Sequence, residues 1–368
     1  MSKHVVIVGG GFGGISAAKA LGNKEGIEVT LVDKTNHHLF QPLLYQVAIA
    51  GLAPSDIASP LRAVLRNYQN IKIIMNEVID LDAEAKLLIL KDSPALAYDE
   101  IIFAHGVQNN YFNHPEWANL TYGIKDLGDA VSLRNHLLTC FESAEQESDI
   151  KVKNQLLRFI IIGAGPTGVE LAGSIAELSR FTLNTEFKNI QSANSQVIII
   201  EKGTRLLATF DPSLSDKARS QIEELGVHLI LGQGVKNITQ EGVELEDGTF
   251  LASKTIIWSA GVGAGSLSSK IPSEKDRMGR VIVNGNCSLD KYPNLYVIGD
   301  AANFNFKGKP LPGVSPVAIQ QGKYVANTIL KKIEGKDNIN DFSYFDKGSM
   351  STIGRKRAIA DLNFIKLS

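Results

Sequence analysis

Two glycine-rich turns carry the residue types and spacing best suited to chemistry: VGGGFGG at residues 8–14 and IGAGPTG at residues 162–168. Each follows an apolar run and opens a helical pattern. In G-x-G-x-x-G, the first glycine permits a tight turn, the second lets backbone approach a pyrophosphate, and the third lets helix and strand pack closely. The glycines in these places are Gly9, Gly11 and Gly14 in the first turn and Gly163, Gly165 and Gly168 in the second. One such turn is a weak signal, but two in the same context predict two bound dinucleotides.

An acidic residue ends the strand that follows each turn. Asp33 closes IEVTLVD and Glu201 closes SQVIIIE, where a carboxylate can accept hydrogen bonds from ribose hydroxyls. A solvated acid at a strand end is the alternative interpretation. Because a carboxylate repels a 2′-phosphate, Glu201 predicts NADH rather than NADPH as the second nucleotide. The nearby Lys202 and Arg205 leave the NADPH alternative open.

A third strand-end acid indicates which turn holds which nucleotide. Asp300 follows the strand pattern in NLYVIGDAA, far beyond the strand at 250–261 that closes the second dinucleotide unit. It must therefore return to the first unit, where it can reach the ribityl side of a flavin. The alternative is an aspartate that caps the following helix. We therefore predict FAD in the first turn, within a domain that the NADH-binding domain interrupts.

The coarse pattern of elements predicts an α/β fold. Strands are expected at 4–8, 27–33, 71–76, 87–90 and 100–104, and helices at 13–22, 126–148 and 314–333. We predict two Rossmann-like dinucleotide-binding domains, with the NADH domain inserted into a split FAD domain. The expected boundaries are 1–115 and 279–332 for the two parts of the FAD domain, 116–278 for the NADH domain with its bridging helix, and 333–368 for a C-terminal segment at the start of the membrane-facing region.

Composition narrows the function classes. The chain has 368 residues, 44% apolar and 21% charged, with a net charge of −1, so a globular protein of two to three domains is expected without wholesale nucleic-acid binding. No run of 18 apolar residues and no signal peptide is present, which predicts a cytosolic chain. Cys140 and Cys287 form no C-x-x-C pair, which excludes disulfide reductase chemistry. No metal site is expected, because His37 and His38 lack a partner acid or cysteine pattern.

Seven stretches together give the sequence a family resemblance. The chain resembles the two-dinucleotide-domain flavoproteins of the pyridine nucleotide-disulfide reductase-like superfamily, and within it the type II NADH dehydrogenases, which are single-subunit NADH:quinone oxidoreductases. The resemblance covers nearly the whole chain and rests on VGGGFGG, NHHLFQPLLYQVA, IIGAGPTGVELAG, TIIWSAGV, NLYVIGDAA, LPGVSPVAIQQGKYVA and DKGSMSTIGRKRAIAD.

The resemblance implies FAD-dependent, non-proton-pumping oxidation of NADH, with electrons passing from the flavin to a membrane quinone. It implies FAD contacts from Gly9, Gly10, Gly11, Phe12, Gly13, Gly14, Asp33, Lys34, Val78, Asp300 and Ala318. It implies NADH contacts from Gly163, Gly165, Gly168, Glu201 and Gly261, with Glu170 near the flavin and nicotinamide. It implies a quinone end formed by Gln320 and Gln321, with Tyr45 and Gln46 lining a channel.

Plainer interpretations of the catalytic residues stand beside these. Glu170 could be an acid favoured by a helix N-terminus, Gln320 and Gln321 could be polar residues of a helix's first turns, and Tyr45 and Gln46 could merely pack. An NADH:ferredoxin or rubredoxin reductase, or a flavin redox-sensing interaction protein, is the alternative function.

The sequence also departs from the family pattern. Ser315-Pro316 replaces a common Ala-Gln, and FAHG at 103–106 replaces a common Ala-Thr-Gly, which puts a role for His105 in doubt. Family members normally continue into amphipathic C-terminal helices, whereas this chain ends soon after GRKRAIAD. We therefore expect a peripheral protein on the cytoplasmic side of the membrane, binding its surface weakly or soluble, with a homodimer as an open alternative.

Overall fold

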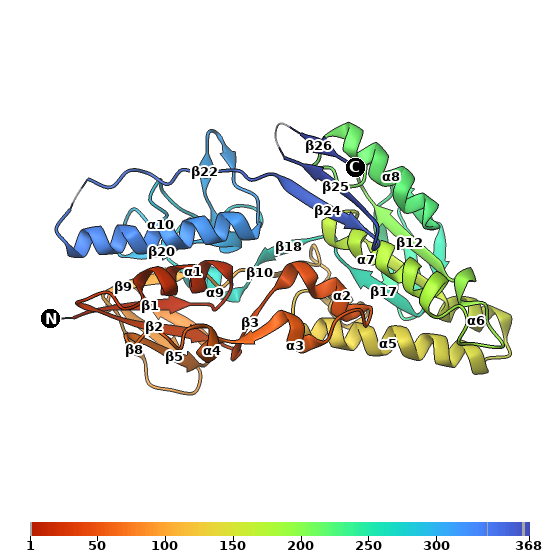
Figure 1. Ribbon diagram of the computed structural model, residues 1–368, viewed down its shortest axis with the longest axis horizontal. Coiled ribbons are helices and arrows are strands. Elements are labelled where there is room, and N and C mark those ends of the chain that lie inside the picture. Colours follow the sequence, from red (N-terminus) through yellow and green to blue (C-terminus); the bar gives the residue numbers. More distant parts are fainter. Residues whose placement is uncertain (1, 337, 363–364) are drawn as a thin grey trace. The chain divides into compact units, whose positions relative to one another are not determined.

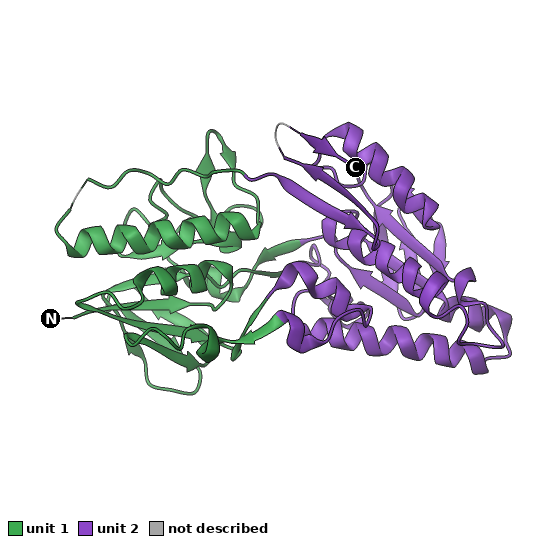
Figure 2. Ribbon diagram, viewed as in Figure 1, with its two compact units in different colours: residues 1–39, 58–108, 262–346 green, residues 40–57, 109–261, 347–368 purple. Residues whose placement is uncertain are grey.

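The structure, a computed structural model, describes residues 2–336, 338–362 and 365–368 (Figure 1). Met1 and two residues of the C-terminal segment expected from the sequence, 363 and 364, lie outside the described residues, as does 337. The chain forms two compact units, each built from three segments (Figure 2). Unit 1 comprises 1–39, 58–108 and 262–346, and unit 2 comprises 40–57, 109–261 and 347–368.

Unit 1 contains the first glycine turn and Asp300. Its strands are β1 (Lys3–Val8), β2 (Ile27–Asp33), β3 (His37–Leu39), β4 (Ala58–Pro60), β5 (Ile71–Met75), β6 (Val78–Asp82), β7 (Leu87–Leu90), β8 (Leu96–Ala97), β9 (Glu100–Phe103), β10 (Val107–Asn109, ending at the boundary with unit 2), β18 (Val262–Ala264), β19 (Val281–Ile282), β20 (Leu295–Val297), β21 (Ala302–Asn303), β22 (Asn305–Phe306) and β23 (Lys309–Pro310). Its helices are α1 (Phe12–Leu21), α4 (Leu61–Val64), α9 (Ser266–Lys270) and α10 (Ser315–Ile333).

A five-stranded parallel sheet forms the core of unit 1, in the order β20-β9-β1-β2-β5. The continuous apolar run Val5–Val8 is buried on both faces, as expected of a central parallel strand. Because the strands are parallel, the turns that follow β1, β2, β9 and β20 all leave from the same edge. This edge therefore collects the first glycine turn, Asp33 and the Gly299–Asp300 turn.

Helices α1 and α10 lie side by side in unit 1 (Figure 1). Their contact depends on glycines, since a Cβ atom at Gly322 would collide with the carbonyl oxygen of Gly13. A Cβ atom at Gly13 would in turn lie 3.3 Å from the carbonyl oxygen of Ala318. The two helices therefore approach backbone to backbone, which brings the start of α10 next to the first glycine turn.

Unit 2 contains the second glycine turn. Its helices are α2 (Leu44–Ala48), α3 (Pro54–Ile57), α5 (Leu127–Gln146), α6 (Ile150–Leu156), α7 (Pro166–Glu177) and α8 (Pro212–Glu224). Its strands are β11 (Arg158–Ile162), β12 (Gln196–Glu201), β13 (Val227–Leu231), β14 (Val235–Thr239), β15 (Gly242–Leu245), β16 (Phe250–Ala252), β17 (Thr255–Trp258), β24 (Ser349–Ile353), β25 (Arg357–Asp361) and β26 (Lys366–Leu367).

The central sheet of unit 2 is again parallel, in the order β13-β12-β11-β17. The strand before the glycine turn is β11, and β12, which ends in Glu201, lies on one side of it, as β2 lies beside β1. On the other side of β11 lies β17, which corresponds to β9 in unit 1. The two units therefore repeat the same strand order around their glycine turns.

Two segments distant in sequence complete unit 2. Residues 40–57, which leave and re-enter unit 1 through the antiparallel pair β3–β4, place α2 against α5 and α7. The C-terminal antiparallel strands β24 and β25 pack on α7 and α8. The approach of β24 to α7 is close, since a Cβ atom at Gly173 would lie 2.8 Å from the amide nitrogen of Gly354.

Candidate active site

The first glycine turn has the geometry of a phosphate cradle. Gly9 has φ +105°, and a Cβ atom there would lie 2.5 Å from the carbonyl oxygen of Ala104, which follows β9. A Cβ atom at Gly14 would collide with the carbonyl oxygen of Gly9, so helix and strand touch there. At Gly11 a Cβ atom would meet no atom of the described chain within 4 Å. The middle glycine thus leaves open space above the turn, where a pyrophosphate needs close approach to backbone.

Asp33 binds the turn directly. Its Oδ2 accepts a hydrogen bond from the Gly10 amide at 2.6 Å, and its Oδ1 accepts one from the Thr35 amide at 2.7 Å. The Asp33 carbonyl accepts a hydrogen bond from the Asn76 amide, which brings Val78, two residues further on, to the same edge of the sheet. Lys34 is exposed beside Asp33.

His38 also contacts this turn, although the sequence analysis assigned it no role beyond excluding a metal site. Its Nδ1 lies 3.0 Å from the Gly10 carbonyl oxygen, and its ring packs edge-on against Phe12 with centroids 5.0 Å apart. Burial lowers the pKa of His38, which favours the neutral imidazole. No local pattern could have identified this residue, because the contact arises from the fold of β3 over the turn.

The second turn repeats this geometry closely. Gly163 has φ +106°, and a Cβ atom there would lie 2.6 Å from the Cα of Ala260, which follows β17. A Cβ atom at Gly168 would collide with the carbonyl oxygen of Gly163, as one at Gly14 would with that of Gly9. At Gly165 a Cβ atom would meet no atom of the described chain within 4 Å. Gly261 lies beside this crossing and accepts a hydrogen bond from the Asn110 amide at 3.1 Å.

Glu201 accepts hydrogen bonds from backbone amides at the second turn, as Asp33 does at the first. Its Oε2 accepts a hydrogen bond from the Ala164 amide at 2.9 Å, and its Oε1 accepts one from the Gly203 amide at 2.7 Å. Lys202 and Arg205, the two cations that kept NADPH as an alternative, each bind another partner. Lys202 pairs with Glu246 at 2.9 Å, and Arg205 donates to the Ala208 carbonyl at 2.8 Å.

The helices that follow the two turns lack the side-chain cap that α5, α6 and α8 have. Asp126, Asp149 and Asp211 cap α5, α6 and α8 by accepting hydrogen bonds from backbone amides. At α1 and α7 the cap position is a glycine, and no side chain of the described chain caps either helix. Their first amides therefore remain available to an anion. Open space, exposed amides and a nearby carboxylate fit a dinucleotide at each turn.

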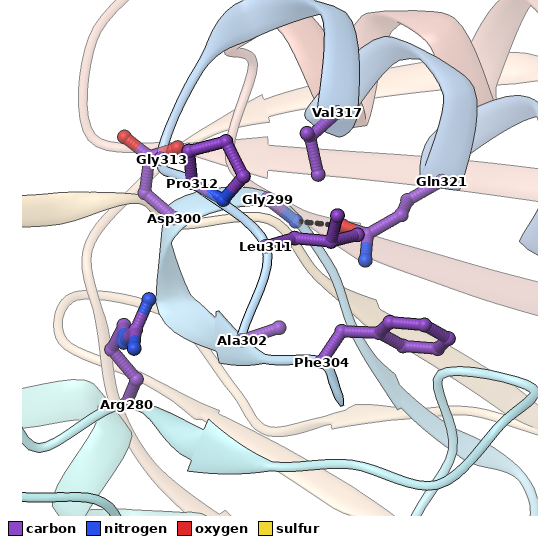
Figure 3. Close-up of a pocket in the computed structure, with 10 residues that line it drawn as sticks. All are labelled: Arg280, Gly299, Asp300, Ala302, Phe304, Leu311, Pro312, Gly313, Val317 and Gln321. Atoms are coloured by element: carbon purple, nitrogen blue, oxygen red, sulfur yellow. Dashed lines mark hydrogen bonds between the residues drawn. The ribbon is translucent and has the colours of Figure 1, made fainter. Parts of the chain in front are cut away.

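The Gly299–Asp300 turn lies in unit 1 next to the start of α10. Gly299 has φ +67°, and a Cβ atom there would lie 3.2 Å from the Cβ of Ala318. Gln321 is 1% exposed, and its Oε1 accepts a hydrogen bond from the Gly299 amide at 2.7 Å (Figure 3). Asp300 and Gln321 both line a pocket beside this turn. Ala318 and Gln321 therefore hold the turn that carries Asp300.

Gln320 contacts a different segment. Its Nε2 donates to the Phe345 carbonyl at 2.9 Å, and its Oε1 accepts from the Phe345 amide at 3.0 Å. The segment before β24 is thus tied to α10 through backbone. Both glutamine amides are engaged within the protein, so donation to an electron acceptor requires an exchange of these bonds or use of the Gln321 Nε2.

Unit 2 brings Glu170, Tyr45 and Gln46 together through Thr352. The Thr352 amide donates to Glu170 Oε1 at 3.3 Å, and its Oγ1 lies 3.0 Å from the Tyr45 hydroxyl. Gln46 Nε2 donates to the same hydroxyl at 3.1 Å. Burial raises the pKa of Glu170 to about 7, against the hydrogen bond from Thr352. This carboxyl can therefore take up or release a proton near neutral pH.

His105 is buried beside the first turn. Its Nε2 lies 2.7 Å from Ser268 Oγ, and its Nδ1 has no hydrogen-bond partner among the described residues. Burial lowers the pKa of His105 to about 4, so the ring is neutral at physiological pH. The residue supports the backbone that crosses Gly9.

Two nucleotide cradles in α/β units define a two-dinucleotide-domain oxidoreductase. The chain belongs to the pyridine nucleotide-disulphide oxidoreductase family, whose model matches residues 3–322. Within that family it belongs to the type II NADH:quinone oxidoreductases. It is 38% identical to the type II NADH:quinone oxidoreductase Ndh of Mycobacterium tuberculosis, over 99% of this chain and 81% of that protein.

A more distant relative and a solved structure are similar to this chain over nearly its whole length. A type II NADH:quinone oxidoreductase of Haemophilus influenzae is 28% identical over 98% of this chain and 87% of its own length. The structure of NDH2 from Plasmodium falciparum in complex with NADH matches with a TM-score of 0.91 and 21% identity, covering 100% of this chain and 91% of that one. The predicted fold class and the predicted family are thereby confirmed.

Proposed function

We propose that this protein oxidises NADH with FAD as its bound redox group and passes the electrons to a quinone. The observation that carries the proposal is the repeated cradle, in which two uncapped helix N-termini each face a glycine turn held by an acid. When bound, FAD accepts a hydride from NADH and returns two electrons to the acceptor. Cys140 and Cys287 are both buried and lie in different units, so a cysteine pair takes no part in the route of the electrons.

The first cradle is proposed for FAD and the second for NADH. Support for this assignment comes from Asp300, which lies in unit 1 with the first cradle. Support for NADH in the second cradle comes from Glu201, since the neighbouring cations are committed to other partners. Glu201 would accept hydrogen bonds from the ribose hydroxyls and disfavour a 2′-phosphate.

Glu170 is proposed as the residue that handles a proton during turnover. Its pKa near 7 lets it exist in both protonation states at physiological pH, which suits a general acid or base. Thr352 orients the carboxyl through its amide and orients Tyr45 through its hydroxyl. Tyr45 and Gln46 are proposed to line the path of the quinone, and Gln320 and Gln321 to act at the acceptor end of the flavin.

The finer setting of the reaction is also a proposal. We propose that the protein works on the cytoplasmic side of the membrane as a peripheral protein, where a quinone dissolved in lipid is available, and that it can form a homodimer. Within residues 2–336, 338–362 and 365–368, none of the helices combines the length and apolar character needed to cross a membrane.

A steady-state assay tests the function. Purified protein loaded with FAD should oxidise NADH with a soluble short-chain quinone as acceptor, at a rate well above that with ferredoxin at equal concentration. The flavin content is read from the visible absorbance before the assay. A holoprotein that reduces ferredoxin rapidly and a quinone slowly would contradict the proposal.

A further inference from the structure

Arg280 places a cation beside the Gly299–Asp300 turn of unit 1. Its guanidinium lines the same pocket as Asp300 and Gln321 (Figure 3). The side chain is only 13% exposed, and its Nε donates to Asp276 Oδ2 at 2.7 Å. This arginine is thus a nearly buried charge aimed at the pocket rather than a solvated surface residue.

Asp276 is itself firmly held, which fixes the direction of the guanidinium. Its Oδ1 accepts hydrogen bonds from the amides of Met278 and Arg280 at 2.8 and 2.9 Å. Its Oδ2 also accepts one from Asn303 Nδ2 at 3.1 Å. Asp276 therefore holds the guanidinium of Arg280 by its Nε.

The two terminal nitrogens of Arg280 have no hydrogen-bond partner among the residues that the structure describes. A guanidinium carries several donors in a rigid fork. Such a fork matches the oxygens of a phosphate, to which it can donate two hydrogen bonds. The pocket therefore presents an acceptor, Asp300, and a prepared donor, Arg280, close together.

We propose that Arg280 is a FAD-binding residue that donates from its terminal nitrogens to the ribityl-phosphate segment of the cofactor. This segment combines hydroxyl groups, which can donate to a carboxylate, with a phosphate, which accepts from a guanidinium. Asp300 and Arg280 offer these two complementary partners. The inference rests on the proposed function, since it takes FAD as the occupant of unit 1.

The test compares Arg280→Gln with a matched control, Arg277→Gln. Arg277 is exposed, lies three residues earlier and does not line the pocket, so both variants lose one positive charge from the same segment. Titration of each apoprotein with FAD, followed by flavin fluorescence, should show a Kd raised roughly tenfold to a hundredfold for Arg280→Gln, as expected for a lost charged hydrogen bond. Arg277→Gln should bind as the wild type does.

A second measurement separates binding from folding. The Tm of the apoprotein should fall in Arg280→Gln, because the ion pair with Asp276 is lost, and FAD should then raise the Tm of the variant by less than it raises that of the wild type. Should Arg280→Gln not fold, Arg280→Lys keeps the charge without the fork, and its Kd should still be raised.

Competition with AMP locates the contact on the cofactor. AMP contains the adenosine and its own phosphate but lacks the ribityl-side phosphate of FAD, so it should compete equally well in the wild type and in Arg280→Gln. A wild-type Kd for FAD in Arg280→Gln, or an equal loss of AMP and FAD binding, would overturn the inference. A wild-type protein that fails to bind FAD at all would instead overturn the proposed function.

Discussion

At the scale of single residues, Asp33 and Glu201 occupy the same place in two cradles, yet Glu201 alone is proposed to select between two nucleotides. Its carboxylate should sit where a 2′-phosphate would lie, and Lys202 and Arg205 each bind another partner. We expect a kcat/KM for NADH roughly a hundredfold or more above that for NADPH, from a repulsion of a few kcal/mol. Glu201→Gln should narrow this ratio. A wild-type preference for NADPH would show that Glu201 has another role.

The buried carboxyl of Glu170 should make stability depend on pH. Its pKa is raised from 4.5 to about 7 in the folded protein, so between these values the folded state holds a proton that the unfolded state has released. The unfolded state then binds fewer protons, and stability falls as pH rises, by at most about 1.4 kcal/mol per pH unit. Glu170→Gln removes this dependence. The Tm of the variant minus that of the wild type should therefore grow from pH 4.5 to 7 and then level off.

Gln321 should matter after hydride transfer rather than before it. If its amide donates to a quinone carbonyl as negative charge develops, Gln321→Leu should slow reoxidation of the flavin by quinone roughly tenfold to a thousandfold. Reduction of the flavin by NADH in a stopped-flow experiment should remain near the wild-type rate. Because Leu leaves the Gly299 amide unpaired, stability should also fall by about 1–3 kcal/mol, so flavin content must be matched first. Slow reduction with fast reoxidation would place Gln321 on the nicotinamide side.

At the scale of elements, the crossing of α1 and α10 links helix packing to the first cradle. A Cβ atom at position 322 would collide with the carbonyl oxygen of Gly13, which is backbone and cannot rotate away. Gly322→Ala should therefore push the helices apart, cost about 1–3 kcal/mol and weaken FAD retention. Lys323→Ala, an exposed change in the same helix, is the control and should leave both unchanged. Thermal unfolding with and without FAD checks this, and a variant as stable as the wild type would contradict the close packing.

The elements with strong periodicity were predictable. The strand expected at 27–33 is Ile27–Asp33, and the helices expected at 126–148 and 314–333 are Leu127–Gln146 and Ser315–Ile333. Each has an apolar pattern or a capping residue that acts locally. The docking of α2 and of β24–β25 on unit 2 was not predictable, because their buried faces are defined by helices far away in sequence. The contacts of His38 and Arg280 were not predictable for the same reason. The two cradles were predictable, because the spacing of their glycines reflects backbone geometry within one short segment.

At the scale of the whole molecule, the C-terminal strands bear on membrane association. Met350 and Leu367 are 65% and 53% exposed, and Arg355 and Lys356 lie in the turn between β24 and β25. Three cations of this segment are paired, Arg355 with Glu177 at 3.9 Å, Arg357 with Glu224 at 2.7 Å and Lys366 with Asp211. We expect weak binding to vesicles of anionic lipid that is lost as salt is raised, measured by cosedimentation. Tight binding that persists at high salt would contradict a mainly electrostatic contact.

The threading of the chain has a consequence for recombination. The polypeptide passes between the two units after residues 39, 57, 108, 261 and 346, so neither unit is a continuous stretch. A graft of 109–261 alone would transplant the second cradle without α2 and β24. It would lack Thr352, whose amide binds Glu170, and Tyr45, whose hydroxyl contacts Thr352. Coenzyme preference can be altered by substitutions within the intact chain, but a continuous segment exchanged alone would lack the residues that contact Glu170 in the candidate site. Gene fragments shuffled within this family should remain functional only where all three pieces of unit 2 come from the same parent.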